Sequence, residues 1–181
     1  MDISNIIKKS KAIKIMEKPS FLFHKKRDIL HAELIYIPYY LFLTEIIIKK
    51  DDNIKVYICI DRISGEYAFV THSYDFDVSE HRKLNLKIGV KEAKKVANRA
   101  VNQFIVAKMR QNISLDEVKI QLIRKFDYPY WLGLYKKGQK GLQFEVIDAI
   151  TGKKQGPKMK PVFMEYMLHQ NELNSQNKSR Q

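Results

Sequence analysis

The sequence has only one cysteine, Cys59, and it is also poor in glycine and proline, with seven and five in 181 residues. A single cysteine excludes an intramolecular disulfide, and with it a small secreted domain held together by disulfides. Hydrophobic residues make up 45% of the chain and charged residues 29%, proportions typical of a globular protein. The length suits one ordinary domain or two small units that share a core.

Long hydrophobic runs are missing as well. The most apolar stretch, residues 34–48, contains Pro38 and Glu45 and is shorter than the roughly 20 residues that a membrane-spanning helix needs. Residues 1–9 contain no uninterrupted apolar segment and no small-residue cleavage site, which argues against a signal peptide. We therefore expect no membrane insertion and a cytoplasmic location.

Negative charge is scarce, because 33 Lys and Arg residues outnumber 20 Asp and Glu residues and give a formal net charge of +13. Such an excess favours anionic partners, either nucleic acid or an acidic protein surface. The charge comes mainly from Lys, whereas Arg is the preferred residue for bidentate contacts with bases and phosphates. The composition thus indicates general affinity for anions more than sequence reading, and an amino-acid bias without a binding role stays an alternative.

What the sequence does contain is an internal match between two segments. Residues 36–43 and 127–134 share Pro, Tyr, an aromatic residue, Leu and a second Leu at the same spacing. In each copy a polar turn and an apolar return strand follow, and then an Asp-x-x-[Ser/Thr]-Gly turn that begins at Asp61 or at Asp148. Asp and Ser/Thr bond the local backbone in such turns, and Gly supplies a positive φ. The match predicts two related β-hairpins.

Periodicity predicts the remaining elements. Strands are expected at residues 56–60, 66–70, 118–122 and 142–147, and helices at 3–16, 90–110 and 162–169. The helix at 90–110 is the clearest, since its apolar residues form one stripe at helical spacing. We predict an α+β fold of antiparallel β-hairpins with helices packed on one face, in two pseudo-repeated units. These units span residues 1–89 and 90–170, followed by a disordered tail at 171–181.

The strand–turn–strand unit that ends in Asp-x-x-[Ser/Thr]-Gly resembles the hairpin of PepSY-type domains, most closely at residues 147–153. In that family a helix precedes the hairpin, as residues 90–110 precede the second copy. The resemblance implies small cystatin-like units, in two copies, and a role in regulating or inhibiting a protein partner. PepSY domains mostly lie outside the cytoplasm, which departs from the location expected here. No functional residue is carried over from the family.

Three groups of residues invite a catalytic or metal-binding interpretation. The stretch from His72 to His81 holds two His and three carboxylates, but its spacing matches no established ligand pattern, which favours a solvated loop. Cys59 lies between two Ile residues in an expected strand, where a buried thiol is more typical than a nucleophile. Asp61 and Asp148 occupy equivalent positions in the two copies, each just before a Ser/Thr-Gly turn. Capping of the local backbone explains the presence of both residues, which argues against an acid–base pair.

The aromatic residues Tyr39, Tyr40, Tyr130 and Trp131 offer a surface for stacking on nucleic-acid bases, but their place beside Leu in expected strands favours the core. The sequence contains no Gly-rich phosphate loop and no hydrolase or metalloprotease motif. We therefore expect no enzyme activity, no catalytic residue, no metal and no cofactor. A pocket formed around His72, Asp75 and His81 is what would favour an enzyme instead.

The leading hypothesis is a non-enzymatic binding or accessory protein with an anionic partner, nucleic acid or an acidic protein. A PepSY-like regulator that docks on another protein is the alternative, and an exposed edge strand at residues 66–70 would favour it. The opposite face of the helix at 90–110 is rich in cations, which is also what an ordinary surface helix looks like. The predicted anion-binding residues are Lys91, Lys94, Lys95 and Arg99 on this helix, with Lys136, Lys137, Lys140, Lys153 and Lys154 on the second hairpin.

Overall fold

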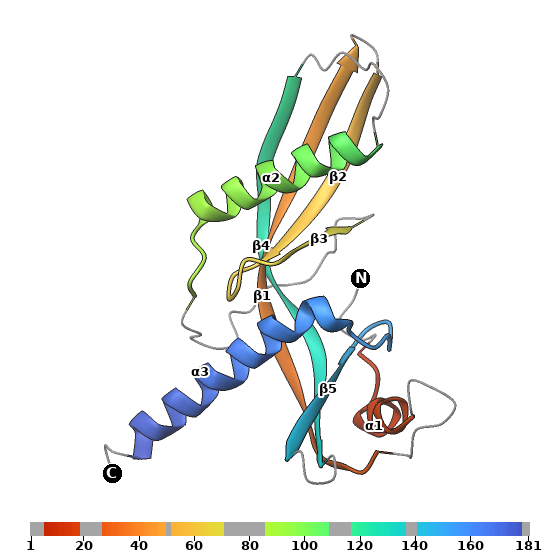
Figure 1. Cartoon of the computed structure of the whole chain (residues 1–181), viewed down its shortest axis with the longest axis vertical. Helices are drawn as coiled ribbons and strands as arrows, with labels where there is room; N and C mark the ends of the chain where they lie inside the picture. The colour runs from red at the N-terminus through yellow and green to blue at the C-terminus, as the bar shows by residue number, and fades with distance from the viewer. Residues whose placement is uncertain are drawn as a thin grey trace. The chain divides into compact units, whose positions relative to one another are not determined.

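The computed structural model describes residues 6–18, 27–49, 52–70, 86–108, 117–136 and 141–178. The fold is α+β, as predicted: three helices pack with a five-stranded antiparallel sheet whose strand order is β3-β2-β1-β4-β5. Figure 1 shows the elements along the chain. They are α1 (Lys9–Glu17), β1 (Ile29–Lys49), β2 (Asp52–Asp61), β3 (Tyr67–Val70), α2 (Val90–Lys108), β4 (Glu117–Lys136), β5 (Leu142–Asp148), a short 3-10 helix (Pro157–Met159) and α3 (Lys160–Lys178).

The chain divides into two compact units that interleave along the sequence. The first unit takes its described residues from 1–37 and 128–160, and the second unit takes them from 38–127 and 161–181. The long strands β1 and β4 each contribute residues to both units. The predicted units, residues 1–89 and 90–170, were defined by the repeat in the sequence and not by contacts in space. That division stays a prediction.

The core of the second unit lies between α2 and the hairpin of β1 and β2. Small residues of the helix pack on larger residues of the strands, as Figure 1 shows for the ribbon of α2 across these strands. The helical stripe was predicted correctly, because Ala93, Ala97 and Ala100 are fully buried. The strand residues of this core are Tyr40, Phe42, Ile46, Ile58 and Ile60.

The core of the first unit lies between α1 and the hairpin of β4 and β5. Ala12 and Met16 pack with Trp131 and Ile147. The helix lies so close to β4 that a Cβ on Gly133 would come within 2.4 Å of the Met16 sulfur. A larger residue at position 133 would therefore require the Met16 side chain to move.

Three boundaries differ from those predicted. The first helix begins at Lys9 rather than at Ile3, because the Ile7 amide donates to the Ala149 carbonyl (2.8 Å) outside the helix. The segments predicted as separate strands at 118–122 and 127–134 form one strand, β4. Residues from 171 on were predicted to be a disordered tail, but α3 continues to Lys178, and no Gly or Pro lies after Pro161 to end it.

Candidate anion-binding site

The predicted basic face of α2 is exposed in the structure. Because Ala93, Ala97 and Val101 turn into the core, the helical period of 3.6 residues places Lys91, Lys95 and Arg99 in one row on the outer side. We call these three residues the basic stripe. Lys94 is also exposed, on the flank of the helix away from Arg99.

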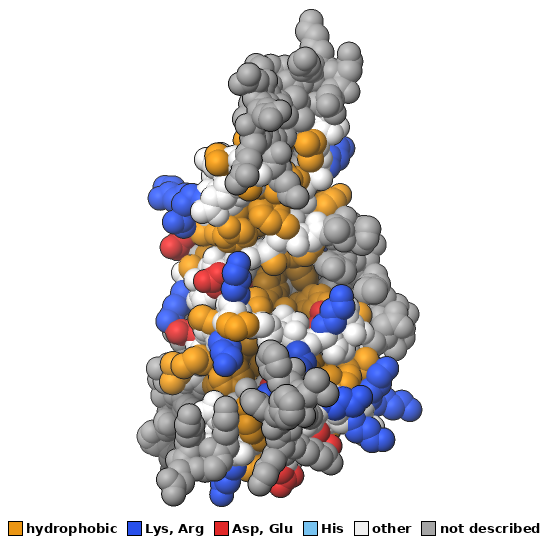
Figure 2. Space-filling view, turned by 45° about the vertical axis from the view of Figure 1, so that its right-hand side comes forward, with side chains coloured by type: hydrophobic (Ala, Val, Ile, Leu, Met, Phe, Trp, Pro, Cys, Tyr) orange, Lys and Arg blue, Asp and Glu red, His pale blue; other side chains and the backbone are white. Residues whose placement is uncertain are grey.

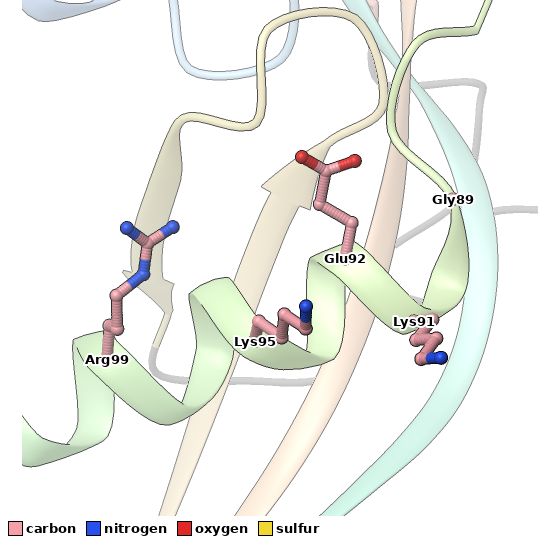
Figure 3. Close-up of a pocket in the computed structure, with 5 residues that line it drawn as sticks. All are labelled: Gly89, Lys91, Glu92, Lys95 and Arg99. Carbon is pink, nitrogen blue, oxygen red and sulfur yellow. The ribbon is translucent and has the colours of Figure 1, made fainter.

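The basic stripe lines an open depression. Gly89, Lys91, Glu92, Lys95 and Arg99 surround a volume of about 660 Å³. Figure 3 shows Lys95 between Glu92 and Arg99 along α2, with Lys91 near Gly89 at the start of the helix. Glu92 is the one acid among these lining residues, so the lining carries a net positive charge.

The chemistry of this depression suits an anion that remains partly solvated. The Arg99 guanidinium can bind a carboxylate or a phosphate through two parallel hydrogen bonds, whereas Lys91 and Lys95 act as mobile point charges. The positive end of the α2 dipole adds to their field, since the helix begins at Val90. The depression is open, which distinguishes it from the enclosed, mostly apolar cavities that hold small molecules.

The predicted lysines of the second hairpin belong to the first unit. Lys136 and Lys153 are exposed, and Lys137 and Lys140 lie outside the described residues. Lys154 is half-buried: its ammonium group donates to the Lys18 carbonyl oxygen (2.7 Å) and lies 3.8 Å from Glu145. Burial lowers the pKa of Lys154, while Glu145 opposes this shift. Lys154 therefore connects the end of α1 with β5, and less of its charge is open to a ligand.

Charged contacts that the sequence did not reveal surround Lys154. Arg27 pairs with Glu145 and stacks over the Tyr135 ring, 5.1 Å from its centroid. Glu145 therefore lies close to two cations, Arg27 and Lys154, and each of these three side chains is at most about a quarter exposed. The partners of Glu145 are far apart in the sequence, so no local pattern could predict the cluster.

A second feature missed by sequence reasoning adjoins α2. The Tyr67 hydroxyl group on β3 donates to Gln103 Oε1 on α2 (2.6 Å). Phe69, also on β3, packs on Phe104 with ring centroids 5.4 Å apart. Tyr67 and Phe69 nevertheless stay 38% and 41% exposed. The sequence offered one signal for this feature: in a strand at residues 66–70, alternation places residues 67 and 69 on the same face of the sheet.

On the face of the molecule that Figure 2 presents, Lys and Arg side chains form small groups separated by hydrophobic side chains.

The two turn carboxylates cap their own turns, as predicted. Asp61 Oδ1 accepts from the amides of Ile63 (3.0 Å) and Ser64 (2.6 Å). Asp148 Oδ1 accepts from the amides two and three residues ahead, at 2.8 Å and 2.9 Å. Asp61 is fully buried, and this burial raises the pKa of its carboxyl group against the opposing effect of the hydrogen bonds from Ser64, Ile63 and Glu66.

The other candidate residues also have structural roles. Cys59 is buried, which raises the pKa of its thiol to about 12 and leaves it protonated at neutral pH. The four aromatic residues proposed for base stacking are at most 8% exposed, which confirms that they belong to the core; they are Tyr39, Tyr40, Tyr130 and Trp131.

Residues 71–85, which include His72, Asp75 and His81, lie outside the described residues. In the part of the chain that the structure describes, no three His, Cys, Asp or Glu residues are grouped so that they could hold a metal ion. Among the described helices, none is both long enough and apolar enough to span a membrane.

No protein-family model, no curated protein and no solved structure matches this chain. The described side chains alone therefore support the function proposed below.

Proposed function

We propose that the protein is a non-enzymatic binding protein whose basic stripe on α2 binds an anionic partner. The observation that carries the proposal is that these cations are exposed and unneutralised. Within the described residues, none of Lys91, Lys94, Lys95 and Arg99 forms an ion pair with an acid. The proposal involves no catalytic residue, cofactor or metal, and it places the protein in the cytoplasm.

Three other surface lysines of the second unit are paired with acids. Lys55 lies 3.1 Å from Glu45, Lys119 lies 3.1 Å from Glu117, and Lys87 pairs with Glu165. Exposed pairs of this kind contribute little to stability, but they cancel charge locally. The basic stripe therefore keeps a positive electrostatic potential, whereas the acids paired with the other three lysines reduce the potential around them. This potential supports binding to a polyanion.

Retention on immobilised heparin and on single- and double-stranded DNA, measured across a salt series, tests this proposal. We expect the protein to be retained at low salt and its affinity to fall steeply as the salt concentration rises. Lys and Arg side chains that bind the polyanion release its counterions, and added salt opposes this release. The slope of a plot of the logarithm of affinity against the logarithm of salt concentration gives the number of anionic groups that the protein neutralises. Passage through all three columns at low salt would show that the +13 charge is compositional and would refute the proposal.

A second candidate function, a PepSY-like regulator that docks on another protein, is supported by the match between the two hairpins. The amide of Arg62 donates to the Pro38 carbonyl (2.8 Å), and the amide of Ala149 donates to the Pro129 carbonyl (3.2 Å). Gly65 and Gly152, which end the two turns, have φ angles of 82° and 71°. These equivalent bonds support our proposal that the hairpins are two copies of one unit.

The strands that follow the two turns support the same proposal. In the first copy Ile60 pairs with Tyr67, and in the second Ile147 pairs with Lys154, so each pair spans the same number of residues. The first pairing continues as β3, whereas the second is an isolated bridge. Gly156 and Pro157 follow soon after Lys154, and proline cannot donate to a ladder.

A further inference from the structure

Strand β3 lies at one edge of the sheet and pairs with β2. The amide of Asp61 donates to the Glu66 carbonyl (3.0 Å), which makes residues 61 and 66 a hydrogen-bonded pair. Because such pairs alternate in an antiparallel ladder, Ala68 directs its backbone groups to β2, while Tyr67 and Phe69 direct theirs outward. Among the described residues, no strand pairs with this outer edge.

The side chains of the same two residues form an apolar strip next to α2. Both Tyr67 and Phe69 contact the helix, through Gln103 and Phe104 respectively, and both stay more than a third exposed. A strand added outside β3 would place every second side chain on this face of the sheet. Apolar side chains at those positions would cover the exposed parts of the Tyr67 and Phe69 rings.

The flank of α2 above this strip is positively charged. Gln103, which accepts from Tyr67, lies one helical turn after Arg99, and Arg99 lies one turn after Lys95. Glu92 is the acid on this flank, and it lies two turns before Arg99, about 10 Å along the axis. Acidic side chains of a segment bound beside β3 would therefore lie closer to Arg99 and Lys95 than to Glu92.

We infer that the outer edge of β3 and the adjoining flank of α2 bind an extended acidic segment of a partner protein by strand addition. Backbone hydrogen bonds to Tyr67 and Phe69 supply affinity, and acidic side chains facing Arg99 supply specificity. The inference rests on the proposed anion-binding function and narrows its partner to an acidic peptide. Nucleic acid lacks the row of amide and carbonyl groups that would continue the ladder.

A labelled peptide in which valine and glutamate take turns at every second position, with threonine between them (the glutamate–valine peptide), places valine and glutamate on the same face of an added strand. Its binding to the full chain, measured by fluorescence anisotropy, tests the inference. We expect it to bind, and the same peptide with lysine in place of glutamate to bind at least about tenfold more weakly, since like charges repel at Arg99 and Lys95. Equal binding of the two peptides would overturn the inference. If neither peptide binds but heparin is retained, this inference fails and the proposed function stands; if heparin is not retained either, the proposed function fails.

A matched pair of variants separates strand addition from simple apolar contact. Phe69→Ala removes the ring and keeps the outward amide, whereas Phe69→Pro removes the ring and the amide together. The Phe69 amide does not face β2, so proline leaves the β2–β3 bonds in place. We expect Phe69→Pro to weaken binding by about a further tenfold beyond Phe69→Ala, and equal losses would overturn strand addition.

Hydrogen exchange on the unmodified chain gives a reading that does not depend on how the variants fold. On addition of the glutamate–valine peptide, the amides of Tyr67 and Phe69 should become protected, because they acquire acceptors. The amides of α1, in the first unit, serve as the internal control. Unchanged exchange at residues 67 and 69 with peptide bound would overturn the inference.

Discussion

Replacing the three residues of the basic stripe, Lys91, Lys95 and Arg99, together by glutamate is expected to weaken binding to heparin and DNA by about a hundredfold or more at low salt. Each cation near an anionic surface contributes about 1 kcal/mol, and reversal adds repulsion to the loss of attraction. The slope of affinity against salt should fall by about one for each cation that no longer neutralises a phosphate. Titration monitored by fluorescence anisotropy, at several salt concentrations starting from a low one, measures both quantities.

Helix α1 provides a control with the same change in net charge. Lys9, Lys11 and Lys14 are exposed on α1, and their replacement by glutamate also removes three cations and adds three acids. We expect this variant to lose only the share of affinity that depends on total charge, so its binding should stay at least about tenfold stronger than that of the α2 variant. Equal losses in the two variants would contradict a site on α2.

Replacing Asp61 by alanine is expected to lower the free energy of unfolding by about 1–3 kcal/mol. The substitution leaves the buried amide of Ile63 and the part-buried amide of Ser64 without their acceptor, and the cost of an unsatisfied buried donor is of this size. Asp148→Ala is the matched control. Its turn is partly exposed, so water can replace part of the lost capping and the effect should be smaller. Urea denaturation of the two variants measures both values, and a larger loss for Asp148→Ala would show that burial of the turn does not set the cost of losing its cap.

Asp61→Asn separates capping from charge. Asparagine keeps an oxygen that accepts from Ile63 and Ser64 but cannot ionise. Burial raises the pKa of Asp61 above its ordinary value of 3.8, so the folded chain holds this proton at pH values where the unfolded chain has lost it. The contribution of Asp61 to stability therefore falls as pH rises from 3.8 through the raised pKa.

The stability of Asp61→Asn relative to the unmodified chain should accordingly increase over this pH interval and level off above it. Urea denaturation of both proteins at a series of pH values, starting in mild acid, makes the comparison. A difference that stays constant, or that decreases as pH rises, would show that burial does not govern the ionisation of Asp61.

The elements with strong local signals could be predicted from the sequence. Helix α2 was found because Ala93, Ala97 and Ala100 recur at helical spacing without an interrupting Gly or Pro. The two turns were found because Asp, Ser or Thr, and Gly each have a separate backbone role there. Both signals act over a few residues, which is the range in which sequence patterns decide structure.

Features that depend on distant segments could not be predicted. The interleaved units arise because β1 and β4 each continue from one unit into the other, and a local pattern carries no such information. The exposure of the basic stripe could be predicted from helical periodicity. The hydrogen bond from Lys154 to the Lys18 carbonyl and its ion pair with Glu145 could not be predicted from any local pattern. Likewise, the hydrogen bond from Tyr67 to Gln103 requires that β3 and α2 meet in space.

Binding of an anion on the outer side of α2 can be followed residue by residue in an NMR titration with a short heparin oligosaccharide, through the shifts of the backbone amides. We expect the largest perturbations at residues 89–99, near the depression lined by Lys91, Lys95 and Arg99, with little change in α1. Perturbations centred on α1, or spread evenly over the exposed lysines of both units, would contradict it.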